Sequence, residues 1–212
     1  MSSNRVHATD NTVTATFVQP HRKGSISLER CLLLRRSVRG FRDQALNQDQ
    51  LGQLLWAAQG VTSADGRRAV PSAGALYPLD LYVVCGMVTS LAAGVYRYVP
   101  GGHALRLLAP GKQHEELVDA MHGQEWIATA PVVVCIAAVF ERTTMKYGIR
   151  GRGYVYLEAG HAAEALMLQA VALDLATTMV GAFSDNDVKR VFHLSGDATP
   201  LCLIPIGRPD SV

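Results

Sequence analysis

The alternation of apolar and polar residues predicts six strands in this chain. Residues 79–85 form an apolar run that predicts a buried strand, and Pro131 opens a second apolar run at 132–140. Pro100-Gly101-Gly102 separates two alternating segments, which is typical of a hairpin. The expected strands are 79–85, 94–99, 104–108, 132–140, 177–180 and 201–206.

Helical spacing of apolar residues predicts five helices. Ser27 can cap the first, and Asn47 with Gln50 resembles a capping box at the start of the second. The longest helix is apolar on nearly all sides, so it should be central and pack against a partner. The expected helices are 28–36, one between Asn47 and Gly60 (which ends it as a C′ glycine), 113–121, 154–175, and 184–193 with Ser184 and Asp187 as a capping signature.

Three segments show no clear helical or strand periodicity of their apolar residues. Residues 1–24 are polar and predict a mobile or draped N-terminal arm before a single domain at 25–212. The long loop 61–78 is rich in Gly, Ser, Ala and Pro, and a loop of this length is usually functional or disordered. The polar segment 142–156 holds Gly148, Gly151 and Gly153, which predict a flexible loop near a pocket mouth.

Composition and charge exclude several classes of function. Of 212 residues 49% are apolar and 18% are charged, which is typical of a globular protein, and a net charge of +2 does not favour nucleic-acid binding. Residues 1–24 lack the apolar core of a signal peptide, and the longest apolar run is too short to cross a membrane. The four cysteines, Cys31, Cys85, Cys135 and Cys202, are far apart and predict buried free thiols rather than a zinc site or disulfides. We therefore expect a cytoplasmic protein that binds no membrane.

A cluster of cations follows the first helix. Arg35, Arg36 and Arg39 stand beside Ser37, and like charges this close repel unless an anion is bound. A phosphate monoester carries nearly two negative charges and suits forked guanidinium donors. The alternative is a solvated basic surface at a helix C-terminus, where cations complement the helix dipole.

Three motifs in this order resemble the FMN-dependent nitroreductase superfamily. Arg35-Arg36-Ser37-Val38-Arg39 is similar to its N-terminal Arg-x-Ser-x-Arg/Lys signature, and residues 71–78 (Pro-Ser-Ala-Gly-Ala-Leu-Tyr-Pro) are similar to its flavin-facing loop. Gly181-Ala182-Phe183 stands where the family places a backbone donor to the flavin. The 71–78 loop, Lys-Tyr-Gly at 146–148 and Glu-Ala-Gly-His at 158–161 resemble the SagB-type branch, which includes thiazoline and oxazoline dehydrogenases.

The resemblance implies an α+β fold, with a central, mostly antiparallel sheet flanked by helices and a long central helix at a homodimer interface. It implies one FMN per subunit at that interface, with the loop 72–76 supplied by the other subunit. Few residues follow Arg208, so exchange of a C-terminal strand between subunits is not expected. The residues expected to bind FMN are Arg35, Arg36, Ser37, Arg39, Pro71, Ser72, Ala73, Gly74, Leu76, Val180, Gly181, Ala182 and Arg208.

The same resemblance implies an oxidoreductase that works by ping-pong turnover. NAD(P)H would bind transiently and reduce FMN, and a small nitro, quinone or similar acceptor would then take the electrons. A second hypothesis is oxidation of an azoline ring, with Lys146 and Tyr147 removing the substrate proton. A third is a non-catalytic flavin-binding protein.

A metal site is not expected. Glu158 and His161 have the Glu-x-x-His spacing of di-iron bundles, but the sequence holds no second such pair. A single pair of this kind is more often a packing pair within a helix.

Overall fold

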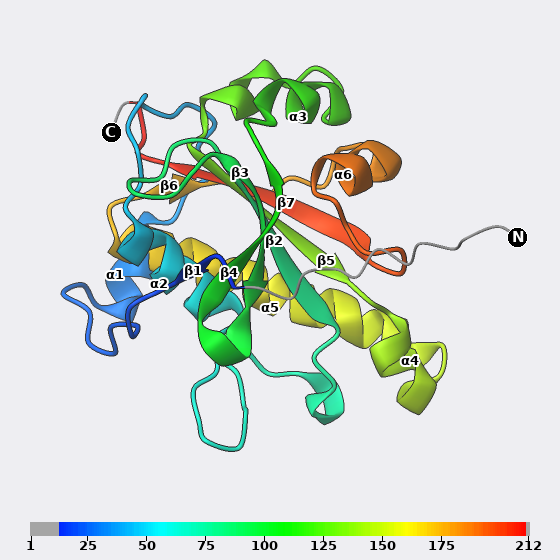
Figure 1. The fold of residues 1–212 in the computed structure, drawn as a ribbon. Coiled ribbons are helices and arrows are strands. Elements are labelled where there is room, and N and C mark those ends of the chain that lie inside the picture. Colours follow the sequence, from blue (N-terminus) through cyan, green and yellow to red (C-terminus); the bar gives the residue numbers. More distant parts are fainter. Residues whose placement is uncertain (1–12, 211–212) are drawn as a thin grey trace, which may run out of the picture.

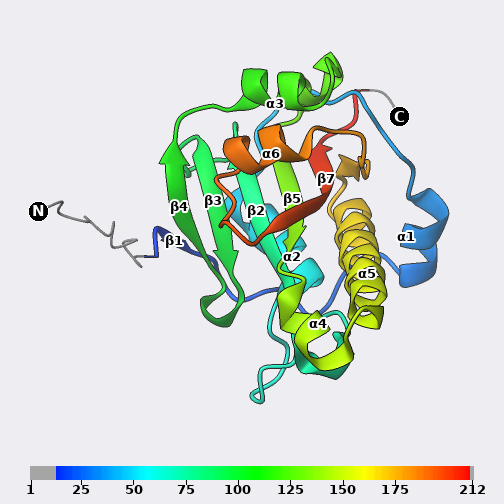
Figure 2. The same ribbon diagram turned by 90° about the vertical axis from the view of Figure 1, so that its right-hand side faces the viewer.

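The computed structural model describes residues 13–210 and has one antiparallel sheet with helices on both faces (Figures 1 and 2). The sheet has seven strands in the order β1-β4-β3-β2-β5-β7-β6, and every neighbouring pair is antiparallel. This architecture confirms the predicted α+β class. The strands are β1 Ala15–Thr16, β2 Leu79–Cys85, β3 Gly94–Val99, β4 Ala104–Pro110, β5 Val132–Ala138, β6 Ala176–Thr177 and β7 Thr199–Gly207.

Helices α1 and α2 begin where a side chain satisfies one of their first backbone amides. Ser27 accepts from the Arg30 amide at the start of α1, and Asn47 and Gln50 form a complete capping box at the start of α2. The α-helices are α1 Leu28–Leu34, α2 Gln48–Gln59, α3 His114–Ala120, α4 Glu141–Tyr147, α5 Arg150–Ala172 and α6 Asp185–Val191. Short 3-10 turns are η1 Ala73–Ala75, η2 Pro100–Gly102 and η3 Glu125–Thr129.

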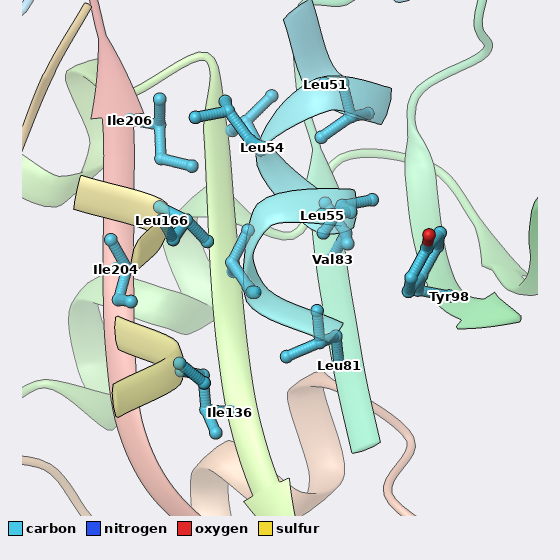
Figure 3. Packing of buried hydrophobic residues seen from close by; sticks show 14 of the residues in the cluster. Leu51, Leu54, Leu55, Leu81, Val83, Tyr98, Ile136, Leu166, Ile204 and Ile206 are labelled. Carbon is cyan, nitrogen blue, oxygen red and sulfur yellow. The ribbon is translucent and has the colours of Figure 1, made fainter. Parts of the chain in front are cut away.

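Alternate residues of the central strands serve two separate cores. Leu81 and Val83 of β2 face α2 and α5, whereas Tyr82 and Val84 of the same strand face α3 and α6. On the first face Leu54 and Leu166 meet side chains of β5 and β7 (Figure 3). The central strands are therefore covered on both sides, which explains their near-continuous apolar sequence.

Helix α5 is the longest element, with 23 residues. It packs on α2, and α1 lies against it (Figure 2). Its buried side faces the sheet, but the opposite side exposes Tyr156 and Leu157, the latter at 63%. That this helix lies at a homodimer interface stays a prediction.

Several predicted boundaries and one predicted loop were wrong. The segment 142–156 is helical: α4 ends at Tyr147 and α5 begins at Arg150, not at residue 154. Gly151 lies within α5, and a Cβ atom there would meet the backbone of Thr143 and Thr144 at 3.1–3.2 Å. Glycine at this position therefore lets α5 approach α4 closely. Gly60 follows α2 with an extended backbone at φ −67°, not as a left-handed C′ glycine.

The strand expected at 177–180 is also different. Ala176 and Thr177 form β6, and only Val180 rejoins the sheet, by a bridge to Leu203. Ser184 precedes α6 as predicted, but its side chain makes no capping hydrogen bond to the helix.

The described part of the N-terminal arm lies on the domain. β1 pairs with β4, and Phe17 is buried in the core formed with α2 and α5. Residues 1–12 of the predicted arm lie outside the described residues. The division at residue 24 stays a prediction.

All four cysteines are buried and free, as predicted, and burial raises the pKa of Cys202 to about 12. The cytoplasmic location stays a prediction. No helix within residues 13–210 combines the length and the hydropathy needed to cross a bilayer.

Candidate functional site

The cation-rich segment after α1 lies along the β6 edge of the sheet. The Val38 amide donates to the Thr177 carbonyl at 3.0 Å, and Ser37 forms a parallel bridge with Thr177. Alternate side chains of an extended segment point to opposite sides. Arg36 and Val38 border a cavity of about 440 Å³ next to the end of α5, and Arg35, Ser37 and Arg39 alternate with them.

The three arginines of this segment are held differently. Arg36 Nη1 donates to the carbonyl oxygens of Leu33 and Arg35 at 3.0 and 2.7 Å, so this guanidinium caps the end of α1. Arg35 Nε lies 3.6 Å from Glu164 Oε1 of α5. Within residues 13–210, Arg39 makes no ion pair and is exposed, so it remains available to an anion.

Two further predicted segments reach the same edge. Arg208 directly follows β7, and its carbonyl accepts from the Arg42 amide at 2.9 Å, which places it beside the cation-rich segment. Val180 pairs with Leu203 of β7 through two backbone hydrogen bonds of 2.8 and 2.9 Å. In the described part of the chain the Gly181 and Ala182 amides have no hydrogen-bond acceptor. We call residues 35–39, 180–182 and 208 the edge group.

The predicted flavin-facing loop is a tightly wound turn. The Tyr77 amide donates to Ser72 Oγ at 2.9 Å, and the Ala75 amide donates to the Ser72 carbonyl at 3.0 Å. Gly74, Ala75 and Tyr77 all have positive φ, of 63°, 55° and 46°. Left-handed backbone at non-glycine residues is costly and tends to occur at functional sites.

Lys146 and Tyr147 cover this loop. A Cβ atom on Gly74 would lie 2.7 Å from the Tyr147 hydroxyl oxygen and 3.0 Å from Lys146 Nζ. Helix α4 is fixed there by Arg142, which donates to the Tyr77 carbonyl at 3.2 Å and to Asp80 Oδ2 at 3.0 Å. We call residues 71–77 with Lys146 and Tyr147 the loop group.

A buried carboxyl supports the loop group from α5. Glu158 is only 3% exposed, and its Oε1 has no hydrogen-bond partner. Burial raises the pKa of Glu158, while the Ser72 hydroxyl, the Ala73 amide and the charge of Arg68 partly offset that rise. Glu158, His161 and Pro71 line a shallow cavity of about 250 Å³. No cluster of three or more metal-ligating side chains occurs in the described residues.

The structure thus brings the predicted residues together in two groups rather than one. The loop group lies at the α4 end of α5, whereas the edge group lies where α5 ends and β6 begins (Figures 1 and 2). Sequence reasoning missed the supporting roles of Arg142 and Glu158. The motif at 158–161 was visible, but its spacing suggested only a packing pair.

With this geometry in place, the comparisons with known proteins identify the family. The chain matches the profile described as "Nitroreductase family" over residues 32–208. It belongs to the nitroreductase family. Members of this family are oxidoreductases that generally use a flavin.

Individual relatives agree with this assignment. The chain is 43% identical over 183 residues to MJ1384 of Methanocaldococcus jannaschii, a provisionally named nitroreductase, covering 86% of this chain and 91% of that protein. A crystal structure of a provisionally named nitroreductase from Ralstonia eutropha matches with a TM-score of 0.80 and 28% identity, over 93% of this chain and 90% of that one. The microcin B17-processing protein McbC of Escherichia coli is 25% identical over 135 residues, 60% of this chain and 49% of McbC.

Proposed function

We propose that this nitroreductase-family protein is an FMN-dependent oxidoreductase that takes electrons from NAD(P)H and passes them to small nitro, quinone or similar acceptors. The observation that carries the proposal is the edge group. There Arg39 and Arg208 lie on neighbouring segments at a sheet edge. The Gly181 and Ala182 amides, which have no acceptor among the described residues, follow Val180, which pairs with Leu203 further along β7. Such a set suits the phosphate of FMN and an electron-rich ring edge.

The residues present fit the cofactor by two further observations. A Cβ on Gly181 would meet no atom within 4 Å, so the backbone there is open to a flat ring. Gly74 of the loop group is exposed, and the absence of a side chain there leaves room for Tyr147 and Lys146 beside the proposed ring. When bound, FMN would supply hydride transfer, which no side chain of this chain can perform.

The chain's own residues would position the bound FMN and stabilise the charge on its ring. Arg39 and Arg208 would neutralise the phosphate, with Arg35 and Ser37 beside them. The Gly181 and Ala182 amides would donate to the ring, where they favour the added negative charge. The loop 72–76 would border the ring and shield it from water.

We further propose that the protein is a homodimer whose FMN sites lie between subunits. Proteins of this fold are typically dimeric. The edge and loop groups lie at different ends of α5, and the exposed apolar side of α5 offers a surface for a second copy. A two-fold arrangement would bring the edge group of one subunit to the loop group of the other.

A second candidate function is favoured by one specific observation. Lys146 Nζ and the Tyr147 hydroxyl lie together over Gly74 at the proposed flavin face, and McbC, a microcin-processing protein, is a distant relative. A SagB-type dehydrogenase would use such a pair to remove a ring proton as hydride leaves for FMN. In that case Lys146→Ala should abolish azoline oxidation while FMN stays bound.

The decisive experiment is anaerobic reduction of the FMN-loaded protein. We expect NADPH or NADH to bleach the flavin absorbance at about 450 nm, and a nitroarene or quinone to restore it. Bound flavin that neither nucleotide reduces would favour a non-catalytic flavin-binding protein. Protein that does not take up FMN, judged by fluorescence titration and by a melting temperature unchanged by FMN, would overturn the proposal.

A further inference from the structure

A cavity of about 540 Å³ lies on the face of the sheet opposite α5 and is lined by none of the residues of the proposed flavin site. Its floor is formed by β2, β3 and β4, and the segment between α6 and β7 passes over it (Figure 2). The volume is within the range of small-molecule sites. The lining residues are Tyr82, Arg97, Arg106, Leu107, Leu108, His193 and Ser195.

The cavity floor contains two like charges in direct opposition. Arg97 of β3 and Arg106 of β4 are cross-strand partners in the sheet register. Like charges directly opposite each other destabilise a sheet unless counter-charge is supplied. For Arg97 that charge is Asp80, whose Oδ1 lies 3.0 Å from Arg97 Nη2.

The carboxylate of Asp80 is not available to Arg106. Its second oxygen is bound by Arg142 Nη2, also at 3.0 Å. Arg97 and Arg142 therefore share the one carboxylate, and Arg106 makes no ion pair within residues 13–210. The three guanidinium groups together carry two positive charges more than Asp80 offsets. Arg106 Nε is buried and has no hydrogen-bond partner, which is an expensive state for a charged donor.

The remaining polar groups of the cavity are hydrogen-bond donors of the kind an oxyanion needs. Ser195 Oγ and the Tyr82 hydroxyl lie 3.5 Å apart, and the exposed His193, on the same segment as Ser195, adds an imidazole. The side chain of Leu108 and the ring of Tyr82 supply an apolar surface beside them. Charge and donors match a dianion, and the apolar wall matches a hydrocarbon or ring attached to it.

We infer that this cavity is a second ligand site, which binds a small phosphate monoester with its phosphate against Arg106 and Arg97. The ligand would be distinct from FMN, because the cavity lies on the other face of the sheet from the loop group. His193 has a left-handed backbone at φ 48°, so the segment that carries it is held in an unusual conformation over the cavity.

The test uses protein saturated with FMN, so that a phosphate cannot enter the proposed flavin site. Calorimetric titration with phenyl phosphate should show one equivalent bound, at least tenfold more tightly than benzoate, which has the same ring and a single charge. Arg106→Met should weaken phenyl phosphate binding at least tenfold. Arg67→Met is the matched control, since Arg67 is an exposed arginine paired with Asp65, and it should change binding less than twofold.

A second cavity variant keeps the test informative if Arg106→Met does not fold. His193→Asn removes the imidazole but keeps a residue that tolerates left-handed backbone, and it should weaken binding severalfold. Flavin content and melting temperature of each variant show whether the fold is intact. Absence of binding by wild-type protein, equal affinity for benzoate, or unchanged binding in both cavity variants would each overturn the inference.

Discussion

At the scale of single residues, we expect substitutions of two arginines in the cation-rich segment to have different effects on FMN binding. Arg39 is exposed and makes no ion pair within the described chain, whereas Arg36 is occupied by the carbonyls of Leu33 and Arg35. Arg39→Ala should raise the Kd for FMN roughly tenfold to a hundredfold, because a hydrogen bond to a charged group contributes about 1.5–3 kcal/mol. Fluorescence quenching of FMN measures this directly.

Arg36→Ala is the control for that experiment. It should lower the unfolding free energy by about 0.5–1.5 kcal/mol through loss of the helix cap, with a much smaller change in Kd. Equal losses of FMN affinity in both variants would show that the segment binds phosphate as a uniform basic patch, not through the side that Arg39 presents.

Glu158 predicts a pH dependence of stability. Its pKa is raised in the folded protein above the ordinary value of 4.5, mainly by burial, so the folded state retains the proton to higher pH than the unfolded state does. Stability should therefore fall as pH rises through the interval between 4.5 and the raised pKa, and the loss should persist above it. Glu158→Gln removes the ionisation but keeps the size of the side chain.

The variant should melt close to wild type at pH 4 and several degrees higher at pH 8, measured by scanning calorimetry with and without FMN. Each kcal/mol corresponds to about 2–4 °C for a chain of this size. A difference in melting temperature that is the same at both pH values would mean that the Glu158 carboxyl stays ionised or stays protonated throughout.

At the scale of elements, contacts between α4 and the loop 71–77 make Gly74 a sensitive position. Gly74→Ala would place a methyl group 2.7 Å from the Tyr147 hydroxyl oxygen, on backbone with φ 63°. We expect loss of about 1–2 kcal/mol from the left-handed backbone and, in addition, displacement of Lys146 and Tyr147. Flavin affinity and the rate of flavin reduction should both fall.

Gly66→Ala separates these two effects. Gly66 also has positive φ, of 83°, but a Cβ there would meet nothing within 4 Å. It should show a similar loss of stability with unchanged flavin affinity. If Gly66→Ala and Gly74→Ala behaved alike in flavin binding, contact between α4 and the loop would have no part in the site.

Elements governed by local chemistry could be predicted from the sequence, whereas those governed by distant contacts could not. The capping residues Ser27 and Asn47 act within three residues of themselves, and both helix starts were found. Helix α4 was missed because its sequence is polar and glycines follow it. Its Arg142 is tied to Asp80, 62 residues away, and such a contact leaves no local pattern.

The candidate site shows the same division. The motifs carrying the edge and loop groups were recognisable as sequence, but their placement in two groups was not, because it depends on how α5 crosses the sheet. The buried state of Glu158 was likewise hidden. A helical period indicates which residues share a face, and it does not say which neighbouring loop covers that face.

At the scale of the whole molecule, the exposed side of α5 predicts a dimer. Leu157→Asp puts a charge on an apolar side chain that is 63% exposed in the single chain. We expect this variant to be monomeric by light scattering and to retain little FMN. Val18→Asp is the control: Val18 is similarly exposed, at 57%, but follows β1 at the opposite edge of the sheet. A dimer that persists in Leu157→Asp would place the interface elsewhere.

The division of the site between two subunits can be tested by mixing two inactive variants. Arg35→Ala with Arg39→Ala damages only the edge group, and Gly74→Val damages only the loop group. Each homodimer should bind little FMN, because every site then contains one damaged group. In a heterodimer of the two, a site built across the interface has both groups intact in one of its two copies.

Co-refolding equal amounts of the variants yields about half heterodimers if chains pair at random, so roughly a quarter of all sites should regain FMN. Sites built within one chain give a different result, since every site would then keep its own damaged group and no binding would return. NADPH should also reduce the FMN bound at these restored sites, because each contains an intact edge group and an intact loop group with Lys146 and Tyr147. The titration end point therefore distinguishes a shared site from two separate ones without any structure of the complex.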